Sequence, residues 1–505
     1  LLYIGTDDGL IQSVDNNGNW VKYDKFPGVP ETTYVSDVYA SRHNENVVYA
    51  AFNNHKNNDF KPYLLKSMDK GKTWTSIASN LPDNGPVWTI EEDMVNPDLL
   101  FVGTEFGLFF TVDGGKKWVQ VKSGFPTIAV RDLDIQEREV DLCIGTFGRG
   151  IYIIDDYSAL REVNEALFSK EAHIFKIKDA LVYNESSFKS RSCEGESYYK
   201  AENPPYGATF TYYIKDSYKT AKQIRKDKDK EDEKAGKSIT YPTFEQLRQE
   251  DLEEAPYLVF AIADAEGNQI RYLNAPNASG IQRLNWDLRY GASLPVSKET
   301  NVNRHSSVHV PPGKYTVTLY KVINGVFTKL TEPLSFNVKY LKEVTFQASD
   351  LAGLSKFHKQ VYSLVANVSN AEINLRDYKN KLASIKNALK VTEGATVNLF
   401  NDVKSAEEKI ASIEKKLLGD ESIAKRAANQ PVSVNDRVQY ITWTMGSSTS
   451  VPTNTNIESL KIAEGQFSEI LKDLVDLRDK MITPLEKKLD EINAPHTPGR
   501  FPKVK

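Results

Sequence analysis

The stretch Thr111-Val112-Asp113-Gly114-Gly115-Lys116-Lys117-Trp118 decides how the first third of this chain folds. Its pattern, Ser/Thr-x-Asp-x-Gly-x-x-Trp, recurs at 67–74, and a variant at 13–20 has Asn17 where the glycine is expected. Asp and Ser side chains bond nearby backbone amides, Gly takes the positive-φ position of the turn, and Trp packs on the hairpin. We expect the positive-φ position to tolerate Asn17. The residues with this structural role are Ser13, Asp15, Trp20, Ser67, Asp69, Gly71, Trp74, Thr111, Asp113, Gly115 and Trp118.

These boxes are parts of a longer repeat. Gly103 precedes Asp113 by ten positions, and the copies that contain Asp15 and Asp155 keep this spacing. The copy that contains 67–74 has about eight additional residues, which we predict to form a loop. Repeats of roughly 40 to 55 residues with short strands and Gly/Asp turns are typical of β-propeller blades. We therefore predict a partial β-propeller over 1–162, with further blades expected upstream of this chain because most propellers need more. The alternative is a complete four-bladed ring.

The boxes are similar to the Asp-boxes (BNR repeats) of sialidases, sortilins and a family of large bacterial proteins often labelled glycosyl hydrolase. Residues 145–158, Gly-Thr-Phe-Gly-Arg-Gly-Ile-Tyr-Ile-Ile-Asp-Asp-Tyr-Ser, resemble the final blade of that bacterial family. The resemblance covers nearly the whole chain and is strongest at 99–160, 280–320 and 434–502. It implies a sortilin-like propeller of which this chain is the C-terminal portion.

The pattern changes at about residue 170. Short strands separated by Gly, Pro and Asn turns predict an antiparallel β-sandwich over 170–342. The runs 280–289 and 311–320 resemble an Ig-like domain of the fibronectin type. A charged insertion at about 216–256 includes Lys226-Asp-Lys-Asp-Lys-Glu-Asp-Glu-Lys, a mixed-sign run that we expect to be solvated or mobile.

The last part of the chain has helical periodicity. Apolar residues at i, i+3 and i+4 mark 351–368 and 457–477, and shorter helices are predicted near 406–418 and 434–444. Gly419 and Pro484 are expected to end or kink helices. We predict an antiparallel helical bundle over 349–494 and an extended tail over 495–505. The fold class is thus multidomain, mainly β plus α.

Composition and charge exclude several classes of function. The formal net charge of −4 gives no electrostatic support for a nucleic-acid partner, and no run approaches the roughly 20 apolar residues of a membrane-spanning helix. The two cysteines have no metal-site spacing. Of seven histidines only His305 and His309 lie close together, in an extended stretch where we expect surface-loop residues. We therefore expect neither a metal nor a cofactor.

The start of the sequence bears on where the protein acts. It has no initiator Met and no signal peptide, so we expect a longer precursor with any targeting signal upstream, and an extracytoplasmic location in the periplasm, at the cell surface or secreted.

Glycoside hydrolysis is the enzymatic hypothesis, and it needs two carboxyl groups about 5 to 9 Å apart. The weak catalytic candidates are Glu105, Asp7 and Glu92 at predicted blade ends, with Asp8, Glu91 and Asp93 beside them. Glu105 occupies the slot that Asp7 and Phe147 occupy in the neighbouring repeats. Arginines are sparse in this region, and they form no cluster typical of a sialidase: Arg42, Arg131, Arg138 and Arg149.

The sequence therefore predicts an extracytoplasmic scaffold that binds a protein, peptide or glycan, with no catalytic set visible in this chain. The alternative is a sialidase-like glycoside hydrolase whose active site is completed by upstream blades. A third hypothesis is a subunit of a cell-surface assembly that uses the helices for contact.

Overall fold

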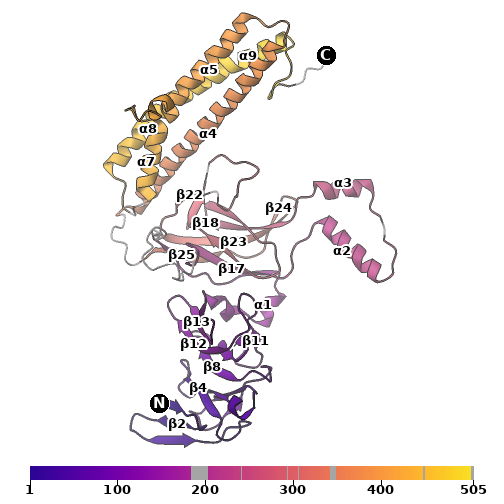
Figure 1. Cartoon of the computed structure of the whole chain (residues 1–505), viewed down its shortest axis with the longest axis vertical. Helices are drawn as coiled ribbons and strands as arrows, with labels where there is room; N and C mark the ends of the chain where they lie inside the picture. Colours follow the sequence, from indigo (N-terminus) through magenta and orange to yellow (C-terminus); the bar gives the residue numbers. More distant parts are fainter. Residues whose placement is uncertain are drawn as a thin grey trace. The chain divides into compact units, whose positions relative to one another are not determined.

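The computed structural model describes residues 1–183, 203–239, 241–292, 294–304, 306–341, 349–446, 448 and 450–501. It is a mixed β and α protein with several sheets and a helical C-terminal region, as the sequence predicts (Figure 1). The chain divides into two compact units. The first is Leu1–Lys176 with Thr211–Asp216 and Ser279–Ile281, and the second is Ile177–Phe210, Ser217–Ala278 and Gln282–Lys505.

Four antiparallel sheets follow one another along the first unit, each with its strands in chain order. They are β1 (Leu2–Gly5), β2 (Ile11–Val14) and β3 (Trp20–Tyr23); β4 (Tyr34–Ala40), β5 (Val48–Asn53), β6 (Tyr63–Ser67) and β7 (Thr75–Ser76); β8 (Val87–Glu92), β9 (Leu100–Thr104), β10 (Gly107–Thr111) and β11 (Val119–Gln120); and β12 (Val130–Gln136), β13 (Asp141–Thr146) and β14 (Ile151–Ile154). The predicted additional loop lies between β5 and β6 and contains a short 3-10 turn, η1 (His55–Asn57).

Each sheet packs on the next through a cluster of buried apolar side chains. Phe52 lies in the cluster between the first and second sheets, Tyr49 between the second and third, and Leu108 between the third and fourth. Two glycines of the repeat allow this close approach. A Cβ on Gly5 or Gly103 would lie 2.5 Å or 2.7 Å from a valine Cγ1 atom of the following sheet. The repeated glycine is therefore a packing requirement between neighbouring sheets.

The boxes at 67–74 and 111–118 form the turn that their sequence predicts. In the second box, Thr111 Oγ1 donates to Asp113 Oδ1 (2.6 Å) and accepts from Gly115 N (3.2 Å), with Gly115 at φ 94°. Trp118 is 3% exposed and donates from Nε1 to the Ile77 carbonyl (2.7 Å). Local hydrogen bonding thus closes the hairpin while the tryptophan packs into the core.

The box at 13–20 differs from this prediction. Gly18, not Asn17, has the positive φ (81°), so the expectation for Asn17 was wrong. Asp15 Oδ1 accepts from the amides of Asn17 (2.9 Å) and Asn19 (2.8 Å), which builds a different turn. Trp20 is 57% exposed and does not fill a core.

The first unit ends in the 3-10 turn η2 (Tyr157–Glu162), the helix α1 (Glu165–Ser169) and the strand β15 (Ala172–Ile174).

The remaining sheets occur between residues 172 and 340. The strands are β16 (Ala180–Val182), β17 (Ala208–Ile214), β18 (Tyr257–Ala263), β19 (Gln269–Ala275), β20 (Gly280–Trp286), β21 (Arg289–Gly291), β22 (Ser306–His309), β23 (Gly313–Ile323), β24 (Val326–Lys329) and β25 (Leu334–Tyr340). One sheet has the order β15-β17-β20, a second has β16-β25-β23-β18-β19 with β24 on β23, and β21 pairs with β22.

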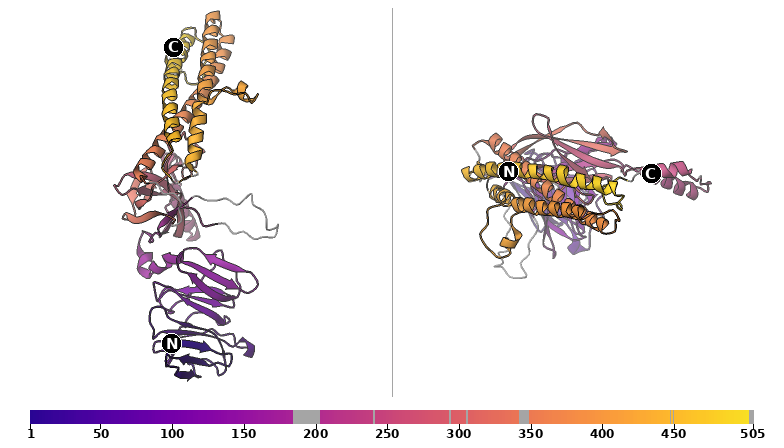
Figure 2. Two further views of the ribbon diagram at one scale, coloured as in Figure 1. Left: turned by 90° about the vertical axis from the view of Figure 1, so that its left-hand side faces the viewer. Right: turned by 90° about the horizontal axis from the view of Figure 1, so that it is seen from above.

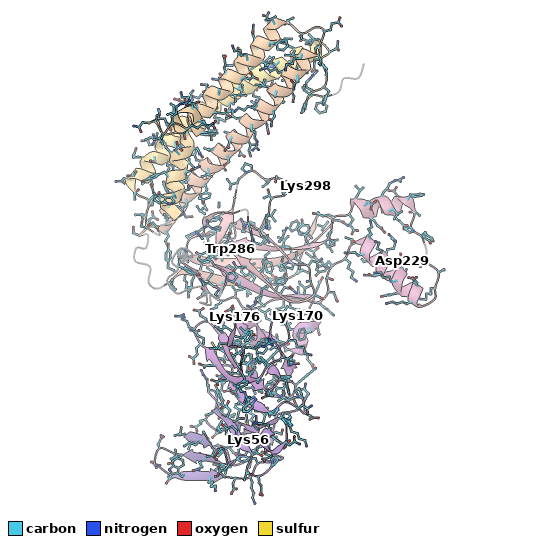
Figure 3. The ribbon with its side chains drawn as sticks, viewed as in Figure 1. Lys56, Lys170, Lys176, Asp229, Trp286 and Lys298 are labelled. Atoms are coloured by element: carbon cyan, nitrogen blue, oxygen red, sulfur yellow. The ribbon has the colours of Figure 1, made fainter. Side chains whose placement is uncertain are left out.

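Aromatic rings join the two larger of these sheets. Trp286 is fully buried (Figure 3), and its ring centroid lies 6.0 Å from that of Phe336. The ring of Phe210 stacks on Phe260 at 5.4 Å. The sequence predicted antiparallel pairing throughout, but β16 runs parallel to β25.

The charged insertion is helical. It forms α2 (Ala221–Lys234) and α3 (Phe244–Leu252), neither with a buried residue, and Asp229 lies on α2 (Figure 3). Thr220 and Thr243 each start a helix with a capping box, and Arg225 Nε donates to Glu250 Oε1 (2.6 Å) across the pair. The insertion is solvent-exposed, as expected, and it forms a pair of helices.

The C-terminal helices are longer than the periodicity indicated. They are α4 (Leu351–Lys390), α5 (Val397–Leu418), α6 (Glu421–Ala424), α7 (Val434–Gly446), α8 (Asn454–Asp476) and α9 (Thr483–Glu491), with a π-helical stretch η3 (Leu477–Ile482) before α9. Gly419 caps α5, as predicted. Pro484 was expected to interrupt or kink a helix; it is the second residue of α9, and the helical backbone runs into α9 through the π-helical stretch η3. α4 and α5 lie side by side (Figures 1 and 2). Beyond α9, Arg500 Nε donates to Asp490 Oδ1 (2.9 Å), which fixes the irregular residues 495–501.

The expectation for His309 was wrong. It lies on β22 as expected of an extended stretch, but burial lowers the pKa of its imidazole to about 4, with nearby Arg289 as a second cause. His309 is half-buried, with its Nδ1 atom buried, and is not a surface-loop residue. His305 lies outside the described residues.

None of the helices described is long and apolar enough to cross a membrane.

Candidate functional site

The first unit has one edge on which the turns of all four sheets gather. This turn edge comprises the β1–β2 turn, the β5–β6 loop, the β9–β10 turn and the β13–β14 turn, together with the first residues of β4, β8 and β12. The strand register places the first residues of β8 and β12 beside the turns of their own sheets, because Val87 pairs with Thr104 and Val130 pairs with Thr146. Side chains from three successive sheets meet there.

A stack of an arginine on aromatic rings lies at the centre of the turn edge. The Arg131 guanidinium lies 3.5 Å from the centroid of the Trp88 ring and 5.1 Å from that of Phe147. Glu105 Oε2 accepts a hydrogen bond from Trp88 Nε1 (2.8 Å) and lies 3.4 Å from Arg131 Nη2. The His55 ring packs against Trp88 at 5.6 Å. We call Trp88, Glu105, Arg131 and Phe147 the Trp88 cluster.

The Trp88 cluster is held in place but remains accessible. The side chains of Glu105 and Arg131 are 33% and 34% exposed, and Phe147 is 69% exposed. Phe106, beside Glu105, is 47% exposed, and Lys56 lies in the β5–β6 loop of the same edge (Figure 3). Arg131 Nε has no hydrogen-bond partner among the described residues. Aromatic rings and a guanidinium ordered by their neighbours can bind a ligand with little loss of side-chain entropy.

The structure separates the three candidate carboxylates. Asp7 is exposed in the β1–β2 turn, and no described hydrogen bond or ion pair joins it to Glu105. Glu92 lies at the far end of β8 from Trp88, about 13 Å along a strand. It is fully buried and accepts hydrogen bonds from Tyr49 Oη (3.0 Å) and Ser41 Oγ (2.8 Å). Glu92 therefore lies away from the turn edge on which Asp7 and Glu105 are found.

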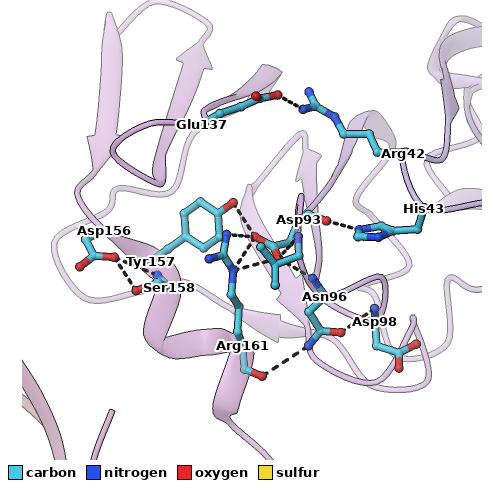
Figure 4. A network of polar contacts seen from close by, with 11 residues as sticks. Arg42, His43, Asp93, Asn96, Asp98, Glu137, Asp156, Tyr157, Ser158 and Arg161 are labelled. Atoms are coloured by element: carbon cyan, nitrogen blue, oxygen red, sulfur yellow. Dashed lines mark hydrogen bonds and ion pairs between the residues drawn. The ribbon is translucent and has the colours of Figure 1, made fainter. Parts of the chain in front are cut away.

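The far end of β8 carries a different polar network. Asp93, fully buried, accepts hydrogen bonds from Arg161 Nη2 (2.7 Å), Arg161 Nε (2.9 Å) and Tyr157 Oη (2.8 Å), and from the amide of Asn96 (2.7 Å) (Figure 4). His43 Nε2 lies 2.7 Å from the Asp93 carbonyl. Asp93 thus joins the third sheet to η2 through Arg161 and Tyr157.

Glu91, which also lies near the end of β8, is a carboxyl group with a strongly raised pKa. Burial raises the pKa of Glu91 to about 7, even though Tyr39 Oη donates to it (3.0 Å) and Arg42 Nη2 lies at 3.5 Å. The negative charges of Asp134 and Asp37 raise this pKa further. A carboxyl group that stays protonated near neutrality can donate a proton.

We predict that Glu91→Gln stabilises the protein at pH 8. The folded pKa of Glu91 exceeds its ordinary value of 4.5, so the stability of the native state falls as pH rises from about 4.5 to about 7. Gln removes this titration and keeps an acceptor for Tyr39. Urea denaturation should show a gain of up to about 3 kcal/mol at pH 8 and almost none near pH 4.5. A loss of stability at pH 8 would contradict this assignment.

Sequence reasoning missed Trp88 and undervalued Arg131. Trp88 lies outside every box, and only its place one residue after the start of a predicted strand could have indicated that it reaches the turn edge. No group of three His, Cys, Asp or Glu in the described part of the chain could hold a metal ion.

Comparisons with known proteins yield only remote similarity. No family model matches the chain, and no curated protein matches its sequence. Similar solved structures include the extracellular domain of a protein described as a hybrid two-component system of B. thetaiotaomicron (11% identity, TM-score 0.25, 67% of this chain and 36% of that one). They also include a GH74 xyloglucanase from Xanthomonas campestris (12%, 0.25, 65% and 52%) and an ancestral GH74 enzyme (12%, 0.24, 65% and 38%). This chain thus spans about a third to a half of those proteins, and TM-scores this low establish no shared fold.

Proposed function

We propose that the first unit is part of a β-propeller whose turn edge binds a peptide or glycan outside the cytoplasm. The observation that carries this proposal is the Trp88 cluster, in which an arginine packs over two aromatic rings and remains partly exposed. Trp, Tyr and Arg dominate the energetic hot spots of binding surfaces, and preordered side chains bind at lower entropic cost. The ligand class is therefore one with flat apolar faces and polar edges.

The outer faces of the end sheets support the propeller interpretation. Ile151 and Ile153 of β14 correspond in strand register to Leu108 and Phe110 of β10. Leu108 is fully buried against the fourth sheet, whereas Ile151 and Ile153 are 76% and 58% exposed. At the other end Leu2, Ile4 and Trp20 are 59%, 40% and 57% exposed. Both faces have the composition of a surface that packs against another sheet of the same repeat.

We further propose the domain division that the sequence predicts: propeller blades over 1–162, an Ig-like sandwich over 170–342, helices over 349–494 and a tail over 495–505. In this proposal the resemblance to sortilin-like Asp-box proteins supplies the extracytoplasmic location. The same domain division is compatible with a protein that acts as a subunit of a cell-surface assembly.

The test is a screen of the full chain on peptide and glycan arrays, followed by affinity measurements on the strongest ligand. We expect Trp88→Ala and Phe147→Ala each to weaken binding at least tenfold, because each removes one face of the stack. Trp443→Ala is the matched control, since Trp443 is an exposed (73%) aromatic residue on α7. Binding that survives both turn-edge substitutions would overturn the proposal.

The alternative is a glycoside hydrolase, and Glu91 favours it because its pKa lies near 7. In that case Glu91 is the general acid, and exposed Asp134 on β12 is the second carboxylate. Release of nitrophenol from a panel of nitrophenyl glycosides, abolished by Glu91→Gln, is the result that this alternative requires.

A further inference from the structure

The second unit contains a cavity of about 120 Å³ where the ends of β22 and β25 meet the first turns of α4 and the end of α7. Aromatic and apolar side chains make up most of its wall. Its polar lining includes Arg289, His309, His358, Tyr206, Tyr340 and Tyr362. The volume is close to that of the roughly 150 Å³ cavities that bind benzene. The cavity can therefore hold one ring or a short branched chain.

The two histidines in this wall are uncharged at neutral pH. Burial lowers the pKa of His358 to about 4, and burial together with nearby Arg289 lowers that of His309 to about 4. His309 Nδ1 is buried and has no hydrogen-bond partner among the described residues. A neutral imidazole offers one donor and one acceptor. The histidines can thus bond a ligand without adding charge to the cavity.

Arg289 is the one formally charged side chain among the described lining residues. Its Nη1 donates to the Ser307 carbonyl (2.8 Å), and it forms no ion pair with a described carboxylate. A partly buried guanidinium with a single neutral partner retains donors in the bidentate geometry that suits a carboxylate. The cavity therefore combines an apolar space for one ring with one guanidinium, while a nearby acidic group, Asp287, accepts from the Arg289 backbone amide and forms no described ion pair with the guanidinium.

We propose that this cavity binds a small monocarboxylate, with its ring or short chain among the tyrosines and its carboxylate on Arg289. The site lies in the second unit, so it is independent of the ligand proposed for the Trp88 cluster. Its volume of about 120 Å³ accommodates a ligand of about the dimensions of benzoate. Neutral analogues of the same shape lack the group that Arg289 pairs with and bind more weakly.

The test measures sodium benzoate binding to the full chain by saturation-transfer NMR and titration calorimetry. We expect saturable binding at neutral pH, at least tenfold tighter than that of benzyl alcohol. Arg289→Gln should weaken it at least tenfold. Ser355→Leu, which adds apolar volume on the helical wall of the cavity, should abolish binding without lowering the melting temperature.

Trp88→Ala is the control and should bind benzoate as the unchanged protein does, which separates this inference from the proposed function of the turn edge. The inference is overturned if benzoate does not bind, if benzyl alcohol binds equally well, or if folded Arg289→Gln keeps full affinity.

Discussion

Replacing Asp93 by alanine is expected to lower the free energy of unfolding by about 3–5 kcal/mol, the cost of removing one partner of a buried ion pair. The Asp93 side chain is fully buried and holds the Arg161 guanidinium through two nitrogens, with Tyr157 as a third donor (Figure 4). Alanine would leave these donors without an acceptor inside the protein. Urea denaturation followed by circular dichroism measures the loss.

The pH dependence of this loss has a definite sign. Burial tends to raise the pKa of Asp93, but hydrogen bonds from Arg161, Asn96 and Tyr157 hold it below its ordinary value. The ionised carboxylate therefore stabilises the protein above the unfolded pKa near 3.8, and this contribution is lost as pH falls through the folded pKa. The deficit of Asp93→Ala should be largest at neutral pH and shrink below pH about 4.

Asp83→Ala is the matched control, because Asp83 is an exposed aspartate of the same sheet region with no described hydrogen bond. We expect it to change stability by less than about 0.5 kcal/mol. Equal effects of the two substitutions would show that Asp93 does not join the third sheet to η2.

The sequence could predict the local structure of the first unit but not its surface cluster. In the box 111–118 the side chains of Thr111 and Asp113 bond groups within four residues of themselves, so this turn can be predicted from the local sequence. Trp118, in contrast, donates to the Ile77 carbonyl of the second sheet region, outside the box. The Trp88 cluster draws on β8, the β9–β10 turn and β12, which are brought together only by packing of the sheets. Glu105 could be singled out by its slot in the repeat, whereas its partners could not.

Two other differences have specific physical causes. The insertion was expected to be solvated or mobile because its charged side chains cannot form a core. Two capping boxes nevertheless start helices there in the absence of a core, formed by Thr220 with Gln223 and by Thr243 with Gln246. His309 was expected to be a surface-loop residue because it lies in an extended stretch. It is half-buried because residues far along the chain, such as His358 on α4, line the same cavity.

The second large effect is expected for Trp118→Ala, at about 3–5 kcal/mol. Trp118 is 3% exposed, packs in the core between the second and third sheets, and donates to the Ile77 carbonyl. Alanine would leave a cavity and would remove the donor to the Ile77 carbonyl. Trp20→Ala changes the same position of another box, where the side chain is 57% exposed. Its effect in this chain should be about 1 kcal/mol or less, with both variants compared by urea denaturation.

This pair of variants separates two possible roles of the box tryptophan. If it acted through the turn itself, Trp20→Ala and Trp118→Ala would cost the same, and our interpretation would be wrong. If it acts by packing between sheets, the cost depends on whether a neighbouring sheet is present. Trp20→Ala should then become strongly destabilising in a longer protein in which another sheet covers the outer face of β1, β2 and β3, as the propeller proposal requires.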